Sequence, residues 1–298
     1  MFDTKTDMIR RLAYFVSERE NILYNKVVDP MQKKPWTEDE ILRKYRFCNI
    51  HRRDDRVSAW IIQNIIIPYK EHEWLWIMLC IARYINWPPT IQDIMDKGEW
   101  PVDSFSATAF GEIIDKRMKR GKKTWTGAYL ITGRNIPKDM GKGYFIAKNM
   151  IEPLFSNETI PHYLTHTMPK DRSIEEVLTL FKGVYGWGTF MAGQAVADMT
   201  YCHLLDRAKD LYTFAPIGPG STRGLNRIYG RALEQIAHQD TFNEELIETL
   251  ETAKGWATID LNTLTLHDWQ NCMCEFDKYI RASNGGRPRS NYTPETSF

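Results

Sequence analysis

The fold is decided by the sequence FKGVYGWGTFMAGQAVADM, residues 181–199. Apolar residues at helical spacing lead into it from Ile174, and the same spacing resumes at Phe190. Between the two apolar runs lie glycines, which mark turns: Gly183, Gly186 and Gly188. We therefore expect two helices joined by a glycine-rich turn, a helix-hairpin-helix, with the second helix continuing to Asp210.

The second helix of such a hairpin begins with backbone N–H groups that have no partner inside the helix, and the helix dipole favours an anion there. We expect this end to bind a DNA phosphate through Gly186, Trp187, Gly188 and Thr189. The alternative is a turn packed in a core. A basic run could line the same DNA backbone, or could be an ordinary solvated face; it contains Lys119, Arg120, Lys122 and Lys123.

A second glycine-rich block follows in the sequence TFAPIGPGSTRGLNR, residues 213–227. Ser221 and Thr222 can cap a helix that carries Arg223, Asn226 and Arg227 on its first turns. Two such helix starts resemble the core of the helix-hairpin-helix DNA glycosylases. The block departs from that pattern because Ser221 and Thr222 stand where a glycosylase holds its aspartate, and Tyr185 is an extra residue in the hairpin. Hydrolytic base removal is therefore disfavoured, while binding of a flipped nucleotide is not.

Composition limits the class of protein. The chain has 298 residues, 43% of them hydrophobic, and can bury a substantial core. Its 39 basic and 38 acidic residues leave a net charge of +1, so a nucleic-acid surface requires local clustering of charge. Five cysteines without a CxxC pair argue against a disulfide framework and a zinc knuckle. We expect a reducing compartment, no metal, no cofactor and no membrane partner.

Capped amphipathic segments account for most of the chain. The most apolar segment, residues 71–86, is expected at the centre of the core. Capping-box patterns pair Thr37 with Glu40 and Ser173 with Glu176. Residues 125–135 fit no helix and suggest a short hairpin or an extended loop. The expected fold class is all-α and helix-hairpin-helix DNA glycosylase-like.

The expected domain organisation is a single helical catalytic domain over residues 1–282, or two closely packed lobes, with the helix-hairpin-helix core at 173–231. Residues 283–298 are rich in Gly, Pro and Ser, and we expect them to form a flexible tail.

The stretch YRFCNIHRRDDRVSAW, residues 45–60, contains four arginines within eleven positions. The planar guanidinium group suits bidentate phosphate binding, so we take several residues of this stretch as candidate ligands of a phosphate: Arg46, Arg52 and Arg56, with Asn49 and Asp55. The alternative is a charged corner in which aspartates cap the next helix and pair with the arginines. One cap does not require four arginines.

The last amphipathic helix, residues 265–281, carries polar residues beside its apolar stripe. Asp268 is expected to be the acid of a capping box with Thr265. Other polar residues of this helix have no role so simple and are candidate site residues: Gln270, Glu275, Asp277 and Lys278.

Taken as an ordered set, RFCNIHRRDDRVS, AYLITGRN, GVYGWGTFMAGQAVADM, APIGPGSTRGLNR and DWQNCMCEFDKYIR resemble the phage-associated alpha-glutamyl/putrescinyl thymine pyrophosphorylase family. That family includes the amino acid:DNA transferases of thymidine hypermodification and a related helical domain found with 5-hydroxymethyluracil DNA kinases. The resemblance covers residues 42–292. It implies a viral enzyme of the host cytoplasm that uses double-stranded DNA containing a modified thymine, in which a free amino acid displaces phosphate or pyrophosphate from the 5-methylene carbon.

Such a transfer needs a flipped base, a cationic cradle for the leaving group and an acceptor for a proton of the attacking amine. The resemblance makes Arg52 and Arg56 candidates for the cradle, and Asp277 or Glu275 candidates for the base or the counter-ion of the amine. Substrate contacts are expected from Arg46, Asn49, Asp55, Ser221, Arg223, Asn226, Gln270 and Lys278. The chain has no GxxxxGK[ST] motif, which argues against its phosphorylating the base itself.

Two alternatives remain open beside the transferase. One is a glycosylase or lyase that excises a modified base. The other is a non-catalytic helical DNA-binding module that presents DNA to a separate 5-hydroxymethyluracil DNA kinase.

Overall fold

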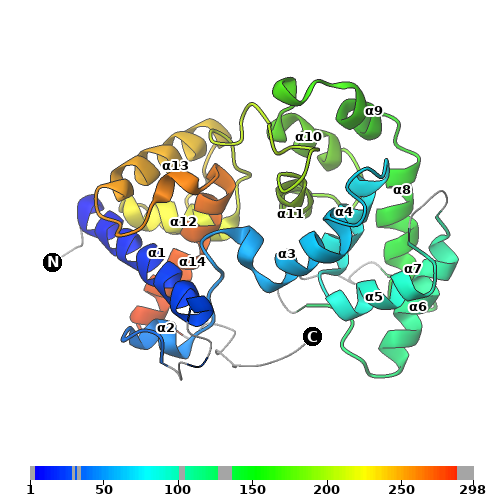
Figure 1. Ribbon diagram of the computed structural model, residues 1–298, viewed down its shortest axis with the longest axis horizontal. Coiled ribbons are helices and arrows are strands. Elements are labelled where there is room, and N and C mark those ends of the chain that lie inside the picture. The colour runs from blue at the N-terminus through cyan, green and yellow to red at the C-terminus, as the bar shows by residue number, and fades with distance from the viewer. Residues whose placement is uncertain (1–3, 29–30, 32–34, 101–104, 127–135, 287–298) are drawn as a thin grey trace. The chain divides into compact units, whose positions relative to one another are not determined.

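The computed structural model describes residues 4–28, 31, 35–100, 105–126 and 136–286 (Figure 1). Every regular element in these residues is a helix, and none of them forms a β-strand, which confirms the all-α prediction. The chain divides into two compact units, one of Met1–Asp55 with Leu211–Ser297 and one consisting mainly of Arg56–Asp210. Within the described residues, no helix combines the length and the apolar character needed to cross a bilayer.

The first unit is built from an N-terminal and a C-terminal segment of the chain (Figure 1). Its elements are α1 (Lys5–Val28), α2 (Glu40–Lys44), the 3-10 turn η1 (Arg52–Asp54), α12 (Pro219–Ile228), α13 (Gln239–Lys254), the 3-10 turn η5 (Leu261–Thr263) and α14 (Leu266–Ser283).

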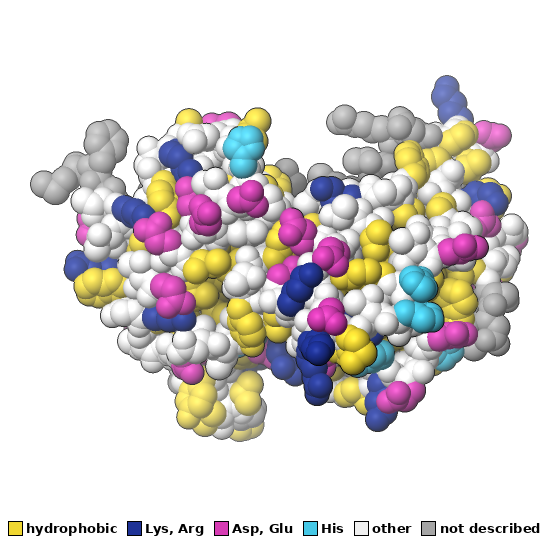
Figure 2. Space-filling model, turned by 90° about the horizontal axis from the view of Figure 1, so that it is seen from above, with side chains coloured by type: hydrophobic (Ala, Val, Ile, Leu, Met, Phe, Trp, Pro, Cys, Tyr) yellow, Lys and Arg dark blue, Asp and Glu magenta, His cyan; other side chains and the backbone are white. Residues whose placement is uncertain are grey.

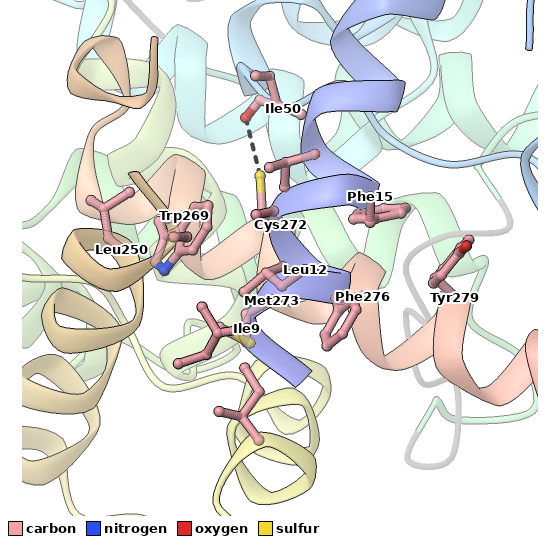
Figure 3. Close-up of a cluster of buried hydrophobic side chains, with 14 of the residues drawn as sticks. Ile9, Leu12, Phe15, Ile50, Leu250, Trp269, Cys272, Met273, Phe276 and Tyr279 are labelled. Atoms are coloured by element: carbon pink, nitrogen blue, oxygen red, sulfur yellow. Dashed lines mark hydrogen bonds between the residues drawn. The ribbon is translucent and has the colours of Figure 1, made fainter. Parts of the chain in front are cut away.

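The core of the first unit lies between α1, α13 and α14 (Figure 3). Leu12 and Phe15 of α1 are almost fully buried, as are Trp269 and Phe276 of α14. These residues follow the apolar stripes read from the sequence, because residues three and four apart share one face of a helix. Because this stripe of α14 is buried in the core, the polar side of the helix faces away from the core and is the side on which a site could form.

The capping box predicted at the start of α14 is present. The Thr265 hydroxyl accepts the Asp268 N–H at 3.1 Å, and the Asp268 carboxylate accepts the Thr265 N–H at 3.2 Å. The predicted Thr37 cap is wrong, because Asp39 caps α2 by accepting from Ile41. The Thr37 hydroxyl instead donates to Glu18 of α1.

The start of α12 also differs from the prediction. Gly218 is the N-cap residue and Pro219 the first helical residue, so Ser221 and Thr222 lie inside the first turn instead of capping it. Proline is favoured at that position because the N–H it lacks would have no helical partner. The Ser221 hydroxyl donates to the carbonyl of the N-cap residue Gly218 instead of accepting from the first backbone N–H groups.

The second unit is an assembly of short helices (Figure 1). Its elements are α3 (Arg56–Ile61), the π-helical turn η2 (Ile62–Ile66), α4 (Leu75–Ile85), α5 (Pro88–Asp96), α6 (Ala107–Lys119), α7 (Lys142–Ile146), the π-helical turn η3 (Ala147–Ile151), α8 (Glu152–Phe155), α9 (Thr159–His166), the 3-10 turn η4 (Pro169–Asp171), α10 (Ile174–Lys182) and α11 (Thr189–Met199).

Helix α4 is the central helix of the second unit, as its apolar sequence predicts, and all eleven of its residues are buried. Trp76 packs near Phe181 of α10, with ring centroids 6.1 Å apart. Arg83 is also buried and pairs with Asp198 of α11, with Nε 2.5 Å from Oδ2. A buried arginine needs such a partner, so this pair ties α4 to α11.

The glycine-rich turn does join two helices, α10 and α11, but the second ends at Met199 and does not continue to Asp210. Ser173 is the N-cap of α10, as predicted, and its hydroxyl accepts the Glu176 N–H. Asp210 supports this helix start, because its carboxylate accepts the Ile174 N–H at 2.7 Å and the Ser173 hydroxyl at 2.7 Å. Arg172 donates to the carbonyl of His203 at 2.8 Å. The chain after α11 therefore folds back onto the start of α10.

Two predicted features fall wholly or largely outside the described residues. They are the hairpin or loop at 125–135, of which only Trp125 and Thr126 are described, and the tail at 283–298, which is described only to residue 286.

Candidate functional site

Helices α12 and α14 of the first unit pack closely, with glycines of α12 at the contact. A Cβ on Gly220 would lie 2.2 Å from Cys274 Sγ, and a Cβ on Gly224 would lie 2.4 Å from the Met273 carbonyl oxygen. Only glycine permits this approach. The polar residues at the start of α12 therefore lie beside the polar side of α14.

Asp277 of α14 holds two arginines of α12. Its carboxylate is 1% exposed, and Arg223 Nε lies 3.1 Å from Oδ2 while Arg227 Nε lies 2.8 Å from Oδ1. The Nη groups of both arginines have no hydrogen-bond partner among the described residues and are not buried. Two guanidinium groups and one carboxylate together carry a net charge of about +1, and the Nη groups supply N–H donors that can bind an anion. We refer to Asp277, Arg223 and Arg227 as the arginine clamp.

Gln270, two turns before Asp277, is bonded to the start of α12. Its Nε2 donates to Ser221 Oγ at 3.0 Å, and the Ser221 hydroxyl donates to the Gly218 carbonyl at 2.9 Å. Asn226, another predicted substrate contact, is 2% exposed and donates to the carbonyls of Leu233 and Gln235. Asn226 therefore holds the end of α12, whereas Gln270 remains partly exposed.

The arginine-rich segment passes along the other edge of the polar side of α14. Glu275 Oε2 accepts the Cys48 N–H at 3.0 Å and lies 3.2 Å from Lys278 Nζ. Lys278 also donates to the Arg46 carbonyl and lies 4.5 Å from the centre of the Phe47 ring. Glu275 Oε1 has no partner among the described residues. One oxygen of Glu275 thus fixes the carboxylate, and the other is available.

Arg52 lies inside the first unit. It is 7% exposed, its N–H donates to Asp268 Oδ1 at 2.9 Å, and its Nη1 lies 3.2 Å from His267 Nε2. Arg46 is exposed, and its side chain has no hydrogen-bond partner among the described residues. Arg56 begins α3 and belongs to the second unit. The three arginines therefore have three different surroundings and do not form one cradle within the first unit.

Asn49 and Asp55 shape the backbone of this segment. Asp55 Oδ1 accepts the Asn49 N–H at 2.9 Å, and the Asn49 side chain donates to the Asp54 carbonyl at 2.7 Å. Arg19 of α1, which the sequence did not single out, donates to Asn49 Oδ1 at 2.7 Å and to the Cys48 carbonyl at 3.1 Å. Burial lowers the pKa of Arg19. These contacts hold the turn in place.

The hairpin of the second unit has one buried and one open side. Trp187 is fully buried, and its indole N–H donates to the Met150 carbonyl at 2.8 Å. Gly186 has φ +84°, and a Cβ there would lie 2.5 Å from Met150 Cγ. Gly188 is the N-cap of α11 and has open space around it. The backbone at Gly188 and Thr189 is thus the part that a ligand could approach, while the Trp187 side chain stays in the core.

The predicted basic run ends α6 in the same unit, and its four members are exposed: Lys119, Arg120, Lys122 and Lys123. Lys123 Nζ lies 3.7 Å from the centre of a Trp87 ring. Figure 2 shows a face on which basic and acidic side chains are interspersed without a large area of one sign. The run remains a predicted DNA contact, within the unit that also carries the hairpin.

Two residues near the polar side of α14 are not among the candidate site residues. Arg227 is expected on the first turns of α12 together with Arg223, and it shares a face of the helix with Arg223, but it is not one of those candidates. Asn271 gave no signal, yet its Nδ2 is buried and has no hydrogen-bond partner in the structure. Burial raises the pKa of Cys274 on the same helix to about 12, so this thiol is neutral. Among the described residues no three metal-binding side chains are grouped to hold an ion.

Comparison with known proteins identifies the family that the chain resembles. Residues 6–286 match the family described as the helical domain of 5-hmdU DNA kinase. The 5-hmdU DNA kinase of Bacillus phage SP10 is 26% identical over 291 residues, a match that covers 90% of this chain and 44% of that protein. The chain thus spans less than half the length of this relative. No solved structure matches the chain significantly.

Proposed function

The chain belongs to the family of 5-hmdU DNA kinase helical domains, and from that membership we propose that it acts in thymidine hypermodification as an amino acid:DNA transferase. Its substrates are double-stranded phage DNA containing phosphorylated or pyrophosphorylated 5-hydroxymethyluracil, and a free amino acid. The amine nitrogen forms a bond to the 5-methylene carbon, the bond from that carbon to the phosphate oxygen breaks, and phosphate or pyrophosphate leaves with the electron pair.

The arginine clamp is the observation that carries this proposal. A departing phosphate gains negative charge, and fixed cations at that position stabilise the transition state more than the ground state. Asp277 holds both guanidinium groups by Nε, which leaves the Nη donors of Arg223 and Arg227 for the phosphate oxygens. The clamp thus supplies the cradle that sequence reasoning sought from Arg46, Arg52 and Arg56.

Glu275 is the better candidate for the proton acceptor. Both oxygens of Asp277 are engaged by arginines, whereas Glu275 uses Oε2 for Cys48 and Lys278 and leaves Oε1 available. The attacking ammonium group must lose a proton before or during attack, and a carboxylate oxygen can take it or bind the amine as counter-ion. In this proposal Asp277 is a positioning residue and Glu275 the base.

The test is analysis of the nucleosides released from modified DNA. Duplex DNA with pyrophosphorylated or monophosphorylated 5-hydroxymethyluracil is incubated with the protein and mixed amino acids, digested and examined by mass spectrometry. A new amino-acid adduct of the nucleoside is the expected result. An abasic site would instead identify a glycosylase or lyase, and unchanged nucleosides with both leaving groups would overturn the transferase.

A second candidate function is favoured by the comparisons themselves. The matched family is named for a kinase, and the relative is a kinase more than twice as long as the matched region. The chain has no P-loop motif. On this alternative it binds 5-hydroxymethyluracil DNA and presents it to a separate kinase. DNA binding without an adduct, together with faster phosphorylation when a 5-hydroxymethyluracil DNA kinase is added, would support it.

A further inference from the structure

The orientation of the Gln270 amide is determined by its neighbours. The Ser221 hydroxyl has one proton, which it donates to the Gly218 carbonyl at 2.9 Å. In the structure Ser221 Oγ accepts from the NH2 group of Gln270, whose Nε2 lies 3.0 Å away. With the Ser221 proton on the Gly218 carbonyl, this orientation of the amide is the one that completes the hydrogen bonds.

This arrangement presents a fixed acceptor beside a fixed donor. Gln270 Oε1 has no hydrogen-bond partner among the described residues, and the second N–H of Nε2 is likewise unused. Neither atom is buried without access to solvent. Gln270 itself is partly exposed. A ligand can therefore meet an acceptor and a donor, side by side, in one fixed order.

We propose that Gln270, held by Ser221, reads the imide edge of a uracil-type base. The edge of 5-hydroxymethyluracil presents the N3–H donor beside the O4 acceptor, which matches Oε1 and Nε2 of Gln270 as a bidentate pair. Cytosine presents the reverse order, an acceptor at N3 and a donor at N4, so Oε1 would face a lone pair. A side-chain amide free to rotate could satisfy both bases, whereas one fixed by Ser221 favours uracil.

The position of Gln270 relative to the arginine clamp agrees with this assignment, which rests on the proposed function. Gln270 and Asp277 are seven residues apart on α14, about two turns or 10 Å along the axis, and share one side of the helix. Both contact α12, Gln270 through Ser221 and Asp277 through Arg223 and Arg227. A base read at Gln270 would extend its phosphorylated 5-methylene arm along this side toward the clamp.

The simpler explanation is that the bond from Gln270 to Ser221 only ties α14 to α12. That explanation gives no reason for a preference between bases. It also predicts that removing any comparable hydrogen bond between segments of the first unit would change DNA binding in the same way. Gln239 supplies the comparison, because its Nε2 donates to the Ala215 carbonyl at 2.7 Å and to Asn243 Oδ1 at 3.1 Å. Gln239→Leu is therefore the matched control.

The experiment measures binding to DNA duplexes that carry one modified base opposite an abasic site, so that the cost of unpairing is the same for each. The bases compared are 5-hydroxymethyluracil, 5-hydroxymethylcytosine and N3-methyl-5-hydroxymethyluracil. Fluorescence anisotropy of the wild-type protein should give about tenfold tighter binding of the first than of either other base, the range of one bidentate base contact.

The variants then test the two residues. Gln270→Leu and Ser221→Ala should each reduce the preference for 5-hydroxymethyluracil over 5-hydroxymethylcytosine to less than about threefold, while Gln239→Leu keeps the wild-type ratio. A folded Gln270→Leu or Ser221→Ala protein with the wild-type ratio overturns the proposal, and so does a wild-type protein that does not distinguish the three bases. The N3-methyl base tests the contact without any variant. Loss of adduct formation with an intact base preference would contradict the transferase and leave this assignment standing.

Discussion

Asp277 and Glu275 lie two residues apart on α14, and their surroundings give them different roles. Asp277 is 1% exposed and shared by two arginines, so its charge is needed to hold those side chains in place. Glu275 is 13% exposed and has one oxygen available beside Lys278. Sequence alone could not separate the two acids, because the partners that distinguish them lie fifty or more residues away in the chain: Arg223 and Arg227 for Asp277, and Cys48 for Glu275.

Replacing each acid by its amide should distinguish an effect on stability from an effect on the reaction. Asp277→Asn removes the negative charge between two partly buried guanidinium groups. We expect it to lower the unfolding free energy by roughly 1–3 kcal/mol. This is less than for a fully buried ion pair, because Arg223 is 38% exposed and water screens its charge. Glu275→Gln should change stability by less than about 1 kcal/mol but reduce adduct formation at least about tenfold. Urea unfolding and the nucleoside assay provide the two measurements. Equal stability losses for both variants would contradict the division of roles.

The arginine clamp can be tested without removing charge. Arg227→Lys keeps the positive charge but loses the planar group that reaches both Asp277 and a phosphate, so adduct formation should slow roughly 10- to 100-fold. The stabilisation that inorganic pyrophosphate gives in a thermal melt should also fall.

Arg231→Lys is the matched control, because Arg231 forms a bidentate pair with Glu245 at 2.8 and 2.6 Å outside the clamp. If the two lysine variants behave alike, the clamp has no special part in binding the phosphate.

At the scale of the elements, helices with strong apolar periodicity were predicted well and their caps less well. The capping box of α14 follows from Thr265 and Asp268 alone, since both partners are local. The cap of α2 does not, because the Thr37 hydroxyl is drawn to Glu18 of α1 and leaves the cap to Asp39. The end of α11 could not be read from periodicity either, because the following segment returns to the start of α10, where Asp210 accepts the Ile174 N–H.

The hairpin between α10 and α11 allows two glycines to be compared. Gly188 has a β-region backbone and open space around it, so Gly188→Val should leave the melting temperature near wild type and weaken DNA binding if the start of α11 contacts a phosphate. Gly186→Val should lower the melting temperature, because φ is +84° and a Cβ would meet Met150. Anisotropy with duplex DNA at low salt checks the first effect. Unchanged affinity in a folded Gly188→Val protein would make the hairpin a core turn only.

At the scale of the molecule, the sequence predicted which segments carry site residues but not how they combine. It indicated the arginine-rich segment, the second glycine block and the last helix, and the first unit does bring residues 45–55, α12 and α14 together. It grouped Arg56 with Arg52 and the hairpin with α12, whereas the boundaries at Asp55 and Asp210 assign these pairs to different units. Helical periodicity reports which face is buried, not which distant segment covers it.

All five cysteines should report on the folding of the whole chain. They form no disulfide, and burial raises the pKa of Cys202 and Cys274 to about 12 and the pKa of the other three well above the ordinary 9.0. A thiol that stays protonated is a poor nucleophile, so iodoacetamide at pH 8 should label the native protein much more slowly than the protein unfolded in urea.

The same shifts predict how stability depends on pH. The folded thiols hold their protons above the pH at which the unfolded thiols lose them, so their contribution to stability is complete below about pH 9 and declines as the pH rises toward 12. Burial is also the chief reason that the pKa values of Tyr84 and Tyr163 are raised to about 12. These tyrosines therefore add to the loss of stability above about pH 10. Urea midpoints measured between pH 7 and 10.5 should therefore be nearly flat at first and then fall. A urea midpoint that increases as the pH is raised beyond 9 would contradict the burial of these thiols and tyrosines. Rapid labelling of several thiols in the native protein would contradict it too.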